Sequence, residues 1–570
     1  MLNHPVSSLF PHMMFSETPV VLRSHRVNAT KTVIAHLRPR RVWRSIAALV
    51  WLAVGLAACL AGSAHAQSTW ISNSGTTWDT AGNWNNGVPL AAGRATFATA
   101  SGTANPFIAT SATAGALTFS SGTFTLSAAA GQSLTLTGTS EVFGATSTIV
   151  TSGTTTISAP LIFGGNGIQS MRANAGGPLT FSGSITKSDL ADLRINGGGS
   201  QITVSGNMTV AGKVLSGANT VILSGSNTVG SWDLAGGGFT LNSDNAMGSS
   251  GAINFDGGTL LFNQTSVDLS SRFTVSTNQS YGVDVAAGRT VTFSSSLAGN
   301  GTGGFIRGGG AGTLILASSA NSFAGPVTIR GPLSVAGIGN SGDNSPLGTT
   351  GTINLGLPGS AAPTSNLLIY TGNGETSNKV ISLSANGGIG GTIQADNPSG
   401  VLRFSSNLGF SSTAAAPVAK TLTLSGSGAG EMQGTIGDNP ALGGRTTSIT
   451  KSGNSIWTLS GANSYSGNTS ISGGVLSIAG TASLPGWNTA GRYTVAAGAA
   501  LTVGNAVSDA DFSTIRTTGS FATNALIGFD TTAGDRTYAG TPLANIGTGT
   551  AIGLMKIGSG TLTMNVVNTY

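Results

Sequence analysis

One motif recurs along the chain and constrains its fold more than any other feature. Residues 451–480 read KSGNSIWTLSGANSYSGNTSISGGVLSIAG, and residues 556–570 read KIGSGTLTMNVVNTY. A third copy with single-residue gaps covers 312–337, and a weaker fourth begins at 220. Each copy contains a strand of alternating character, a turn with Asn and Gly, and a second strand. Such a unit cannot bury its apolar face alone, so the repeat predicts a β-solenoid of stacked coils.

The two copies nearest the carboxyl end share specific residues at one constant offset. Lys451, Gly453, Asn463 and Tyr465 match Lys556, Gly558, Asn568 and Tyr570. We expect Asn463 to be structural, since a turn Asn can bond its own backbone and tolerate positive φ. We expect Tyr465, matched by Phe323 in the third copy, to pack in the core. Lys451 and Lys556 are interpreted as solvated edge charges that discourage pairing between neighbouring molecules.

Composition and hydrophobic periodicity support the same class of fold. Charged residues make up 8% of the chain and Gly 87 of its 570 residues, whereas soluble globular domains average about 25% charged residues. Segments such as TLTLS at 421–425 alternate apolar and polar residues between Gly or Asn turns, which is the pattern of half-buried strands. The mean hydropathy of +0.20 argues against a solvated disordered chain. We therefore predict an all-β chain, a right-handed parallel β-helix or β-solenoid, with almost no helix.

The repeat resembles that of a known family of exported proteins. The pattern Lys-x-Gly, then Leu-Ser-Gly-x-Asn-x-Tyr-x-Gly, then Ile-x-x-Gly-x-Leu, as it stands in 451–476, is similar to the passenger-associated strand repeat of bacterial type V autotransporters. The copy at 312–337 departs from it by lacking the leading Lys. The resemblance implies a secreted β-helical passenger with repeats near 220–260, 309–337, 451–480 and 556–570. It implies no particular activity, because passengers share an export route more than a chemistry.

Residues 1–66 have the organisation of an extended signal peptide. Seven basic residues precede an apolar run from Ile46 to about Leu60, and Ala64-His-Ala66 follows as a small-x-small cleavage site. We expect cleavage after Ala66, export, and a location at the cell surface (outer membrane) or outside the cell. An alternative is a lipobox at 56–59, which would make Cys59 a lipidated first residue.

The segment 67–100 is rich in aromatic residues, including Trp70, Trp78 and Trp84. We interpret it as an N-terminal cap that covers the apolar face of the first coil. The alternative is a carbohydrate-stacking platform of exposed rings. Residues 101–570 then form the solenoid passenger, whose last repeat is truncated.

Removal of the leader leaves a chain without net charge and without several kinds of chemistry. Seven basic residues and Glu17 leave with it, so 18 basic and 18 acidic residues remain, and no nucleic-acid partner is indicated. Cys59 is the sole cysteine, and all five histidines precede residue 67. Ser-His-Asp and Cys-His catalysis, disulfides and His or Cys metal sites are thereby excluded.

The remaining carboxylates give no clear active site, and we predict no catalytic, cofactor-binding or metal-binding residue. Asp509-Ala-Asp511 is interpreted as a solvated turn. An enzymatic alternative, a β-helix lyase or hydrolase acting on polysaccharide, requires acids and bases from separate coils to converge in one groove, for example Asp233, Asp256, Arg272 and Asp284.

The function that we expect is adhesion. Repeated polar ladders on an uncharged wall would bind a host or neighbouring-cell surface, including its glycans, through many weak contacts. Export machinery and an outer-membrane β-barrel encoded downstream are the other expected partners. A passive spacer for a missing effector or barrel is the remaining alternative.

Overall fold

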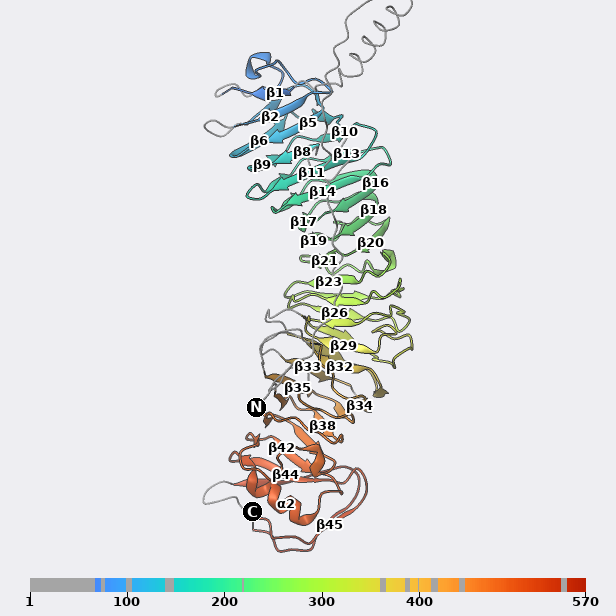
Figure 1. Ribbon diagram of the computed structural model, residues 1–570, viewed down its shortest axis with the longest axis vertical. Coiled ribbons are helices and arrows are strands. Elements are labelled where there is room, and N and C mark those ends of the chain that lie inside the picture. The colour runs from blue at the N-terminus through green and yellow to red at the C-terminus, as the bar shows by residue number, and fades with distance from the viewer. Residues whose placement is uncertain are drawn as a thin grey trace, which may run out of the picture. The chain divides into compact units, whose positions relative to one another are not determined.

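The computed structural model describes residues 67–72, 77–98, 105–138, 148–217, 220–358, 365–384, 390–397, 399–411, 419–439, 446–544 and 551–569. The predicted leader, its cleavage site and Cys59 lie outside these residues, as does Tyr570. The described strands belong to one compact unit, 65–570. In Figure 1 they follow one another in chain order from blue β1 to red β45.

The strands stack in register between successive coils, and every pairing between named strands is parallel. A first sheet comprises β1 (Gln67–Trp70), β2 (Arg94–Phe97), β4 (Ala112–Ala114), β5 (Ala116–Phe119), β7 (Leu134–Leu136), β8 (Ile149–Thr151), β10 (Leu161–Phe163), β11 (Gln169–Asn174), β13 (Ile185–Lys187), β14 (Leu193–Gly198), β16 (Met208–Ser216), β18 (Thr228–Ala235), β20 (Ala252–Asp256) and β22 (Phe273–Val275). A second sheet comprises β3 (Phe107–Ile108), β6 (Thr123–Ala128), β9 (Thr154–Ile157), β12 (Leu179–Phe181), β15 (Ile202–Val204), β17 (Thr220–Leu223), β19 (Gly238–Leu241), β21 (Thr259–Phe262), β23 (Tyr281–Val285), β25 (Phe305–Arg307), β27 (Val327–Ile329), β29 (Thr352–Leu355) and β32 (Val380–Leu383).

Two further sheets form the walls of the later coils. The third comprises β24 (Thr290–Phe293), β26 (Thr313–Leu316), β28 (Leu333–Val335), β30 (Leu367–Tyr370), β33 (Gly391–Ala395), β35 (Lys420–Gly426), β37 (Thr447–Lys451), β39 (Thr469–Ile471), β41 (Tyr493–Val495) and β43 (Ser520–Phe521). The fourth comprises β31 (Glu375–Ser377), β34 (Val401–Phe404), β36 (Ala429–Met432), β38 (Ile456–Leu459), β40 (Val475–Ile478), β42 (Ala500–Val503), β44 (Ala525–Asp530) and β46 (Ile552–Ile557). A small pair joins β45 (Arg536–Tyr538) to β47 (Leu562–Met564). The parallel β-solenoid predicted from the repeat is therefore confirmed.

Coil length varies along the stack. Val221 pairs with Phe239, 18 positions later, whereas Val335 pairs with Tyr370, 35 positions later. The extra residues lie in the loops between strands, so the walls stay in register while the loops differ.

The core is a continuous column of inward-facing side chains. In many strands alternate residues are buried, as in β38, where Trp457 and Leu459 are fully buried. Gly430 of β36, on the preceding coil, pairs with Trp457, and a Cβ at Gly430 would lie 2.6 Å from the indole ring. Glycine there leaves room for the ring, and burial of each such large side chain contributes about 1.5–3 kcal/mol.

At the amino end the tryptophans of the predicted cap are packed rather than exposed. Trp70, Trp78 and Trp84 are 5%, 0% and 3% exposed, and Trp84 contacts the other two edge to face at centroid distances of 5.0 and 4.9 Å. Such pairs stabilise a core beyond simple area burial. The alternative interpretation, a carbohydrate-stacking platform formed by these three rings, is therefore wrong, because the three rings are buried against one another.

One feature of the later coils was not expected. Asp509 and Asp511, predicted to lie in a solvated turn, are in the first turn of helix α2 (Asp509–Thr518), which Ser508 caps by accepting a hydrogen bond from the Asp511 amide. Acidic residues at this end interact favourably with the helix dipole. The helix packs Phe512 against Phe529 at 4.4 Å between ring centroids. Short 3₁₀ turns are η1 (Ala81–Asn83), η2 (Ser270–Arg272) and η4 (Thr481–Ser483).

Candidate functional site

Three of the four residues proposed for an enzymatic groove have separate partners. Asp233 accepts a bond from Lys213 at 3.1 Å, and Asp284 pairs with Arg307 at 2.6 Å. Arg272 donates to the backbone carbonyls of four residues, Met247, Gly248, Ser250 and Gly251. Among these described residues, no hydrogen bond or ion pair joins Asp233, Asp256, Arg272 and Asp284 to one another, so they do not form an acid–base cluster.

Lys451 is not the solvated edge charge that the sequence indicated. Its side chain is fully buried, and Nζ donates to the carbonyls of Ser452, Gly453 and Gly473 at 2.7, 3.1 and 3.0 Å. Gly473 belongs to the turn of the following coil, so the ammonium group connects two coils. Burial lowers the pKa of Lys451 to about 8 because the charged form is poorly solvated there.

Other cations occupy similar inward positions. Arg307 is fully buried and donates to the carbonyls of Gly308, Gly310 and Gly312, and Lys379 to those of Gly348 and Thr350. Lys187 is also buried and pairs with Asp189 at 2.6 Å. A signal for Lys451 was present in the sequence: it has the same parity as the apolar Ile449, and β37 has the burial pattern BiBiB. In a strand, equal parity means the same face.

Three of the repeated asparagines, Asn463, Asn321 and Asn227, each connect three coils. Oδ1 of Asn463 accepts a hydrogen bond from the Ile436 amide, and Nδ2 donates to the Ser483 carbonyl, both at 2.8 Å. Asn321 does the same with Leu297 and Pro346, and Asn227 in the weakest copy with Met208 and Ala246. Asn463 is structural, as predicted, but it bonds neighbouring coils rather than its own turn, and the non-glycine residues described at positive φ are Asn278, Asn366 and Asn524.

The aromatic position of the repeat packs as predicted. Tyr465 is 1% exposed and Phe323 0%. The Tyr465 hydroxyl lies 2.7 Å from Oγ1 of Thr469, and burial raises the pKa of Tyr465 to about 12. The Lys, Asn and Tyr of the repeat are therefore scaffold residues.

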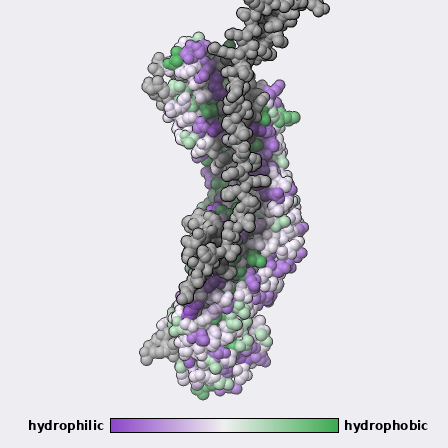
Figure 2. Space-filling view, viewed as in Figure 1, coloured by the Kyte–Doolittle hydropathy of each residue, from purple (hydrophilic) through white to green (hydrophobic). Residues whose placement is uncertain are grey.

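The outer face of the third sheet carries a ladder of hydroxyl groups. Register places one Thr or Ser directly beside the next on six consecutive coils: Thr392, Thr423, Thr450, Ser470, Thr494 and Ser520. These six residues, named here the hydroxyl ladder, are half-buried or exposed. Neighbouring strands are about 4.8 Å apart, which sets the spacing of the hydroxyls. The uncharged polar ladder predicted from the sequence is thus present, and Figure 2 shows much white and purple surface on the face in view.

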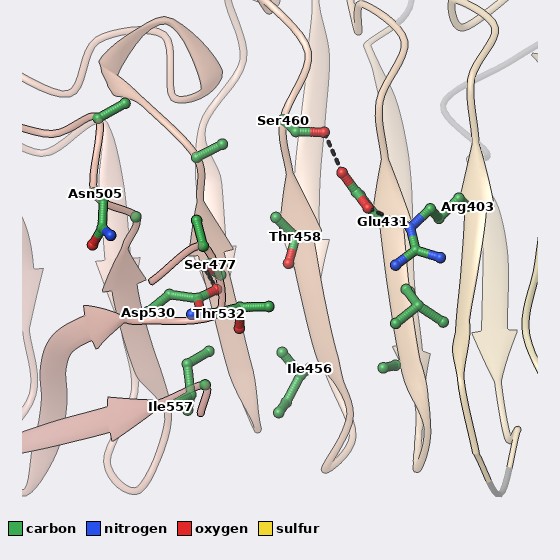
Figure 3. Close-up of a pocket in the computed structure, with 18 residues that line it drawn as sticks. Arg403, Glu431, Ile456, Thr458, Ser460, Ser477, Asn505, Asp530, Thr532 and Ile557 are labelled. Carbon is green, nitrogen blue, oxygen red and sulfur yellow. Dashed lines mark hydrogen bonds and ion pairs between the residues drawn. The ribbon is translucent and has the colours of Figure 1, made fainter. Parts of the chain in front are cut away.

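A groove of about 640 Å³ lies over the outer face of the fourth sheet, lined from Val401 of β34 to Ile557 of β46. Figure 3 shows Arg403 and Glu431 toward one end, and Asp530 and Ile557 toward the other. Its polar lining consists of Arg403, Glu431, Thr458, Ser460, Ser477, Asn505, Asp530 and Thr532. No aromatic residue lines it among the described residues.

Both carboxylates of the groove are held by neighbouring groups. Glu431 accepts bonds from Arg403 at 2.9 Å and from Ser460 at 2.6 Å. Asp530 reaches across β42 to accept a 2.7 Å bond from Ser477 and also accepts one from the Thr532 amide. The groove therefore presents fixed hydrogen-bonding groups. Sequence reasoning missed it, because its residues come from seven successive coils and meet only when the coils stack.

The described residues contain neither a metal-binding cluster nor a membrane-spanning helix. No group of three or more His, Cys, Asp or Glu side chains is arranged to hold a metal ion there. Within the same residues no helix has the length and apolar character needed to cross a bilayer.

Comparison with known proteins gave two findings. The family model of the passenger-associated-transport-repeat matches residues 309–331, 449–478 and 554–570. A relative from Brucella suis biovar 1 (strain 1330), described as the adhesin BmaC autotransporter, is 29% identical over 308 residues, which are 52% of this chain and 8% of that protein. The alignment thus spans a small part of the relative. No solved structure matches the chain.

Proposed function

We propose that this chain, an autotransporter passenger region with passenger-associated-transport-repeats, is an adhesin that binds cell surfaces through many weak contacts. The family implies export and a secreted or surface-exposed location. It also implies export machinery and an outer-membrane translocator as partners. The surface that the chain recognises is that of a host or neighbouring cell.

The observation that carries the proposal is the hydroxyl ladder. The same small, uncharged, hydrogen-bonding group recurs on six consecutive coils of one wall. A single hydroxyl contact in water contributes little, about 0.5–1.5 kcal/mol. When contacts are fixed on one rigid wall, each later contact forms at high effective concentration, so weak contacts add to firm attachment.

The relative's description supports an adhesive role, although only 8% of that protein is aligned. The enzymatic alternative has less support, because three of the four residues named for it, Asp233, Asp284 and Arg272, have separate partners. A lyase or hydrolase would release new reducing ends from a polysaccharide, which an adhesin would not.

Adhesion can be tested with beads that carry the full chain at graded density over cultured host cells and over bacteria. We expect attachment to rise steeply with density, since more ladders engage together. The variant Thr423→Lys with Ser470→Lys places bulky charges on alternate rungs of the hydroxyl ladder. It should reduce bead retention by about tenfold or more, the equivalent of about 1.4 kcal/mol.

The matched control is Ser249→Lys with Ser319→Lys, which adds the same charge at exposed positions off the ladder. It should retain wild-type attachment. An equal loss of attachment in both variants would show that the added net charge, and not its position on the hydroxyl ladder, weakens attachment. If the wild-type chain did not attach at any density, the adhesin proposal would be refuted.

A further inference from the structure

We propose that the groove on the outer face of the fourth sheet binds an uncharged oligosaccharide. This inference rests on the proposed adhesive function and names the ligand class of one part of the surface. It concerns the groove of about 640 Å³ between β34 and β46, a different wall from the hydroxyl ladder.

The position of the groove excludes recognition by strand addition. The groove lies on a sheet face, where β36, β38 and β40 already pair on both sides. Their backbone N–H and C=O groups are used in the ladder, so an extended peptide finds no free edge there. A ligand must be recognised through side chains.

The side chains that line the groove suit a polyhydroxylated ligand. Thr458 and Asn505 line the space shown in Figure 3 from different coils, and Nδ2 of Asn505 donates to the carbonyls of Gly534 and Asp535. Glu431 and Asp530 keep further acceptor capacity, since a carboxylate has about four lone-pair positions. Sugar hydroxyls can donate to these carboxylates and accept from the Thr458 hydroxyl at the same time.

The apolar part of the lining matches the C–H faces of sugar rings. Ile456 is 37% exposed, and Ala429, Ala479 and Ala506 provide small neighbouring surfaces. These residues leave a shallow apolar floor between polar groups. Pockets that hold small ligands commonly combine such a floor with a few fixed polar groups.

Charge selects among glycans. The groove carries two carboxylates and one guanidinium group, and the Arg403 guanidinium is engaged by Glu431. A sulfated or carboxylated glycan would meet net negative charge and no free cation, which disfavours it. Because Glu431 and Asp530 are already held in place, binding of a neutral glycan costs less ordering of side chains.

Isothermal titration calorimetry of the full chain with defined hexasaccharides tests the inference. The neutral probes are cellohexaose, chitohexaose and maltohexaose, and the acidic probes are hyaluronan and heparin hexasaccharides. We expect at least one neutral probe to bind and both acidic probes to bind at least about tenfold more weakly.

Variants locate the binding. Thr458→Trp fills the groove from an outward position at which Thr458 makes no side-chain bond among those described, and it should abolish binding of the neutral probe. Glu431→Gln should weaken binding several-fold. Thr180→Trp, an outward threonine on β12 of the second sheet, is the matched control and should bind as the wild type does.

The outcomes separate this inference from the adhesin proposal. If beads attach to cells but no neutral hexasaccharide binds at millimolar concentration, the groove inference fails and adhesion stands. Preference for the acidic probes, or equal binding by Thr458→Trp and wild type, also overturns it.

Discussion

Two copies of the same repeat differ in how completely their polar residues are paired. Lys451 and Lys556 lie near the start of copies matched by one family model. Lys451 is fully buried, whereas Lys556 is exposed and, within the described part of the chain, its Nζ donates to the Gly558 carbonyl at 2.7 Å. The difference lies in the coil that follows. Gly473 of the next turn supplies the third carbonyl to Lys451, and no coil follows β46 and β47 among the described residues.

The asparagines show the same contrast. Asn463 bonds the coil before and the coil after it. Asn568 accepts from Leu543 of the preceding coil at 2.9 Å, but its amide donates locally to Val566. The polar residues of the repeat therefore act between coils, and their contribution to stability depends on neighbours, as expected for a quasi-one-dimensional fold.

The largest expected effect tests the packed aromatic of the complete copy. Tyr465→Ala should lower the free energy of opening of its coil by about 4 kcal/mol, because a fully buried ring leaves a cavity. Hydrogen exchange of the β37 to β40 amides measures this local opening. Tyr465→Phe is the control and should cost about 1 kcal/mol through the lost bond to Thr469, since Phe323 already occupies this position in another copy. A similar loss for both variants would contradict packing as the main role.

The second effect compares the two lysines. Lys451→Met should cost about 3 kcal/mol, because three carbonyls lose a charged donor in a buried site. Lys556→Met should stay within about 0.5 kcal/mol of the wild type, as for most surface substitutions. Hydrogen exchange at pH 7 distinguishes them. Equal losses of stability in the two variants would show that the different burial of Lys451 and Lys556 does not affect stability.

The third effect compares the asparagines. Asn463→Ala removes two inter-coil bonds and should cost about 2 kcal/mol, whereas Asn568→Ala removes one and should cost about 1 kcal/mol. Guanidinium titration followed by far-ultraviolet circular dichroism can be combined with exchange to measure both. If the asparagines acted only within their own turns, Asn568→Ala would cost more than Asn463→Ala.

The smallest effect is a dependence on pH. Burial lowers the pKa of Lys451 and of Lys379 to about 8, against about 10.4 in an unfolded chain. Between these values the unfolded chain holds more protons, so stability rises with pH. From pH 7 to 9 we expect a gain on the order of 1 kcal/mol per lysine.

The pH measurement has an upper limit and a control. Above pH 10 the raised pKa of Tyr465, about 12, acts in the opposite sense, because the unfolded chain loses its phenolic protons first. Lys451→Met should lose its share of the gain, and Lys556→Met should keep it. A flat profile between pH 7 and 9 in the wild type would contradict the burial of charge.

These scaffold variants also bear on function. None of them alters the hydroxyl ladder or the groove, so adhesion should change only where stability does. If Asn463→Ala or Tyr465→Ala abolished attachment while the opening free energies stayed unchanged, the repeat motif would itself be the recognition surface.

The sequence indicated more of the scaffold than of the surface. The parity of Thr421, Thr423 and their neighbours predicted outward hydroxyls, and the register confirms them as a ladder. The sequence did not predict helix α2, because residues 509–518 carry polar side chains on most faces of the helix. The apolar contact of the helix, between Phe512 and Phe529, joins two coils and is not visible in the local sequence. The groove was missed for a related reason, since Asp530 and Ser477 meet across 53 positions.

By itself the sequence determined the class of fold. Period-2 alternation between glycine turns requires strands, and a repeat that cannot bury its own apolar face requires stacking. The tertiary structure alone decided what each polar residue does: whether Lys451 faces solvent or carbonyls, which coils Asn463 connects, and where carboxylates meet. The physical reason is that coils of 18 to 35 residues place partners at no fixed separation, so their contacts exist only once the register is set.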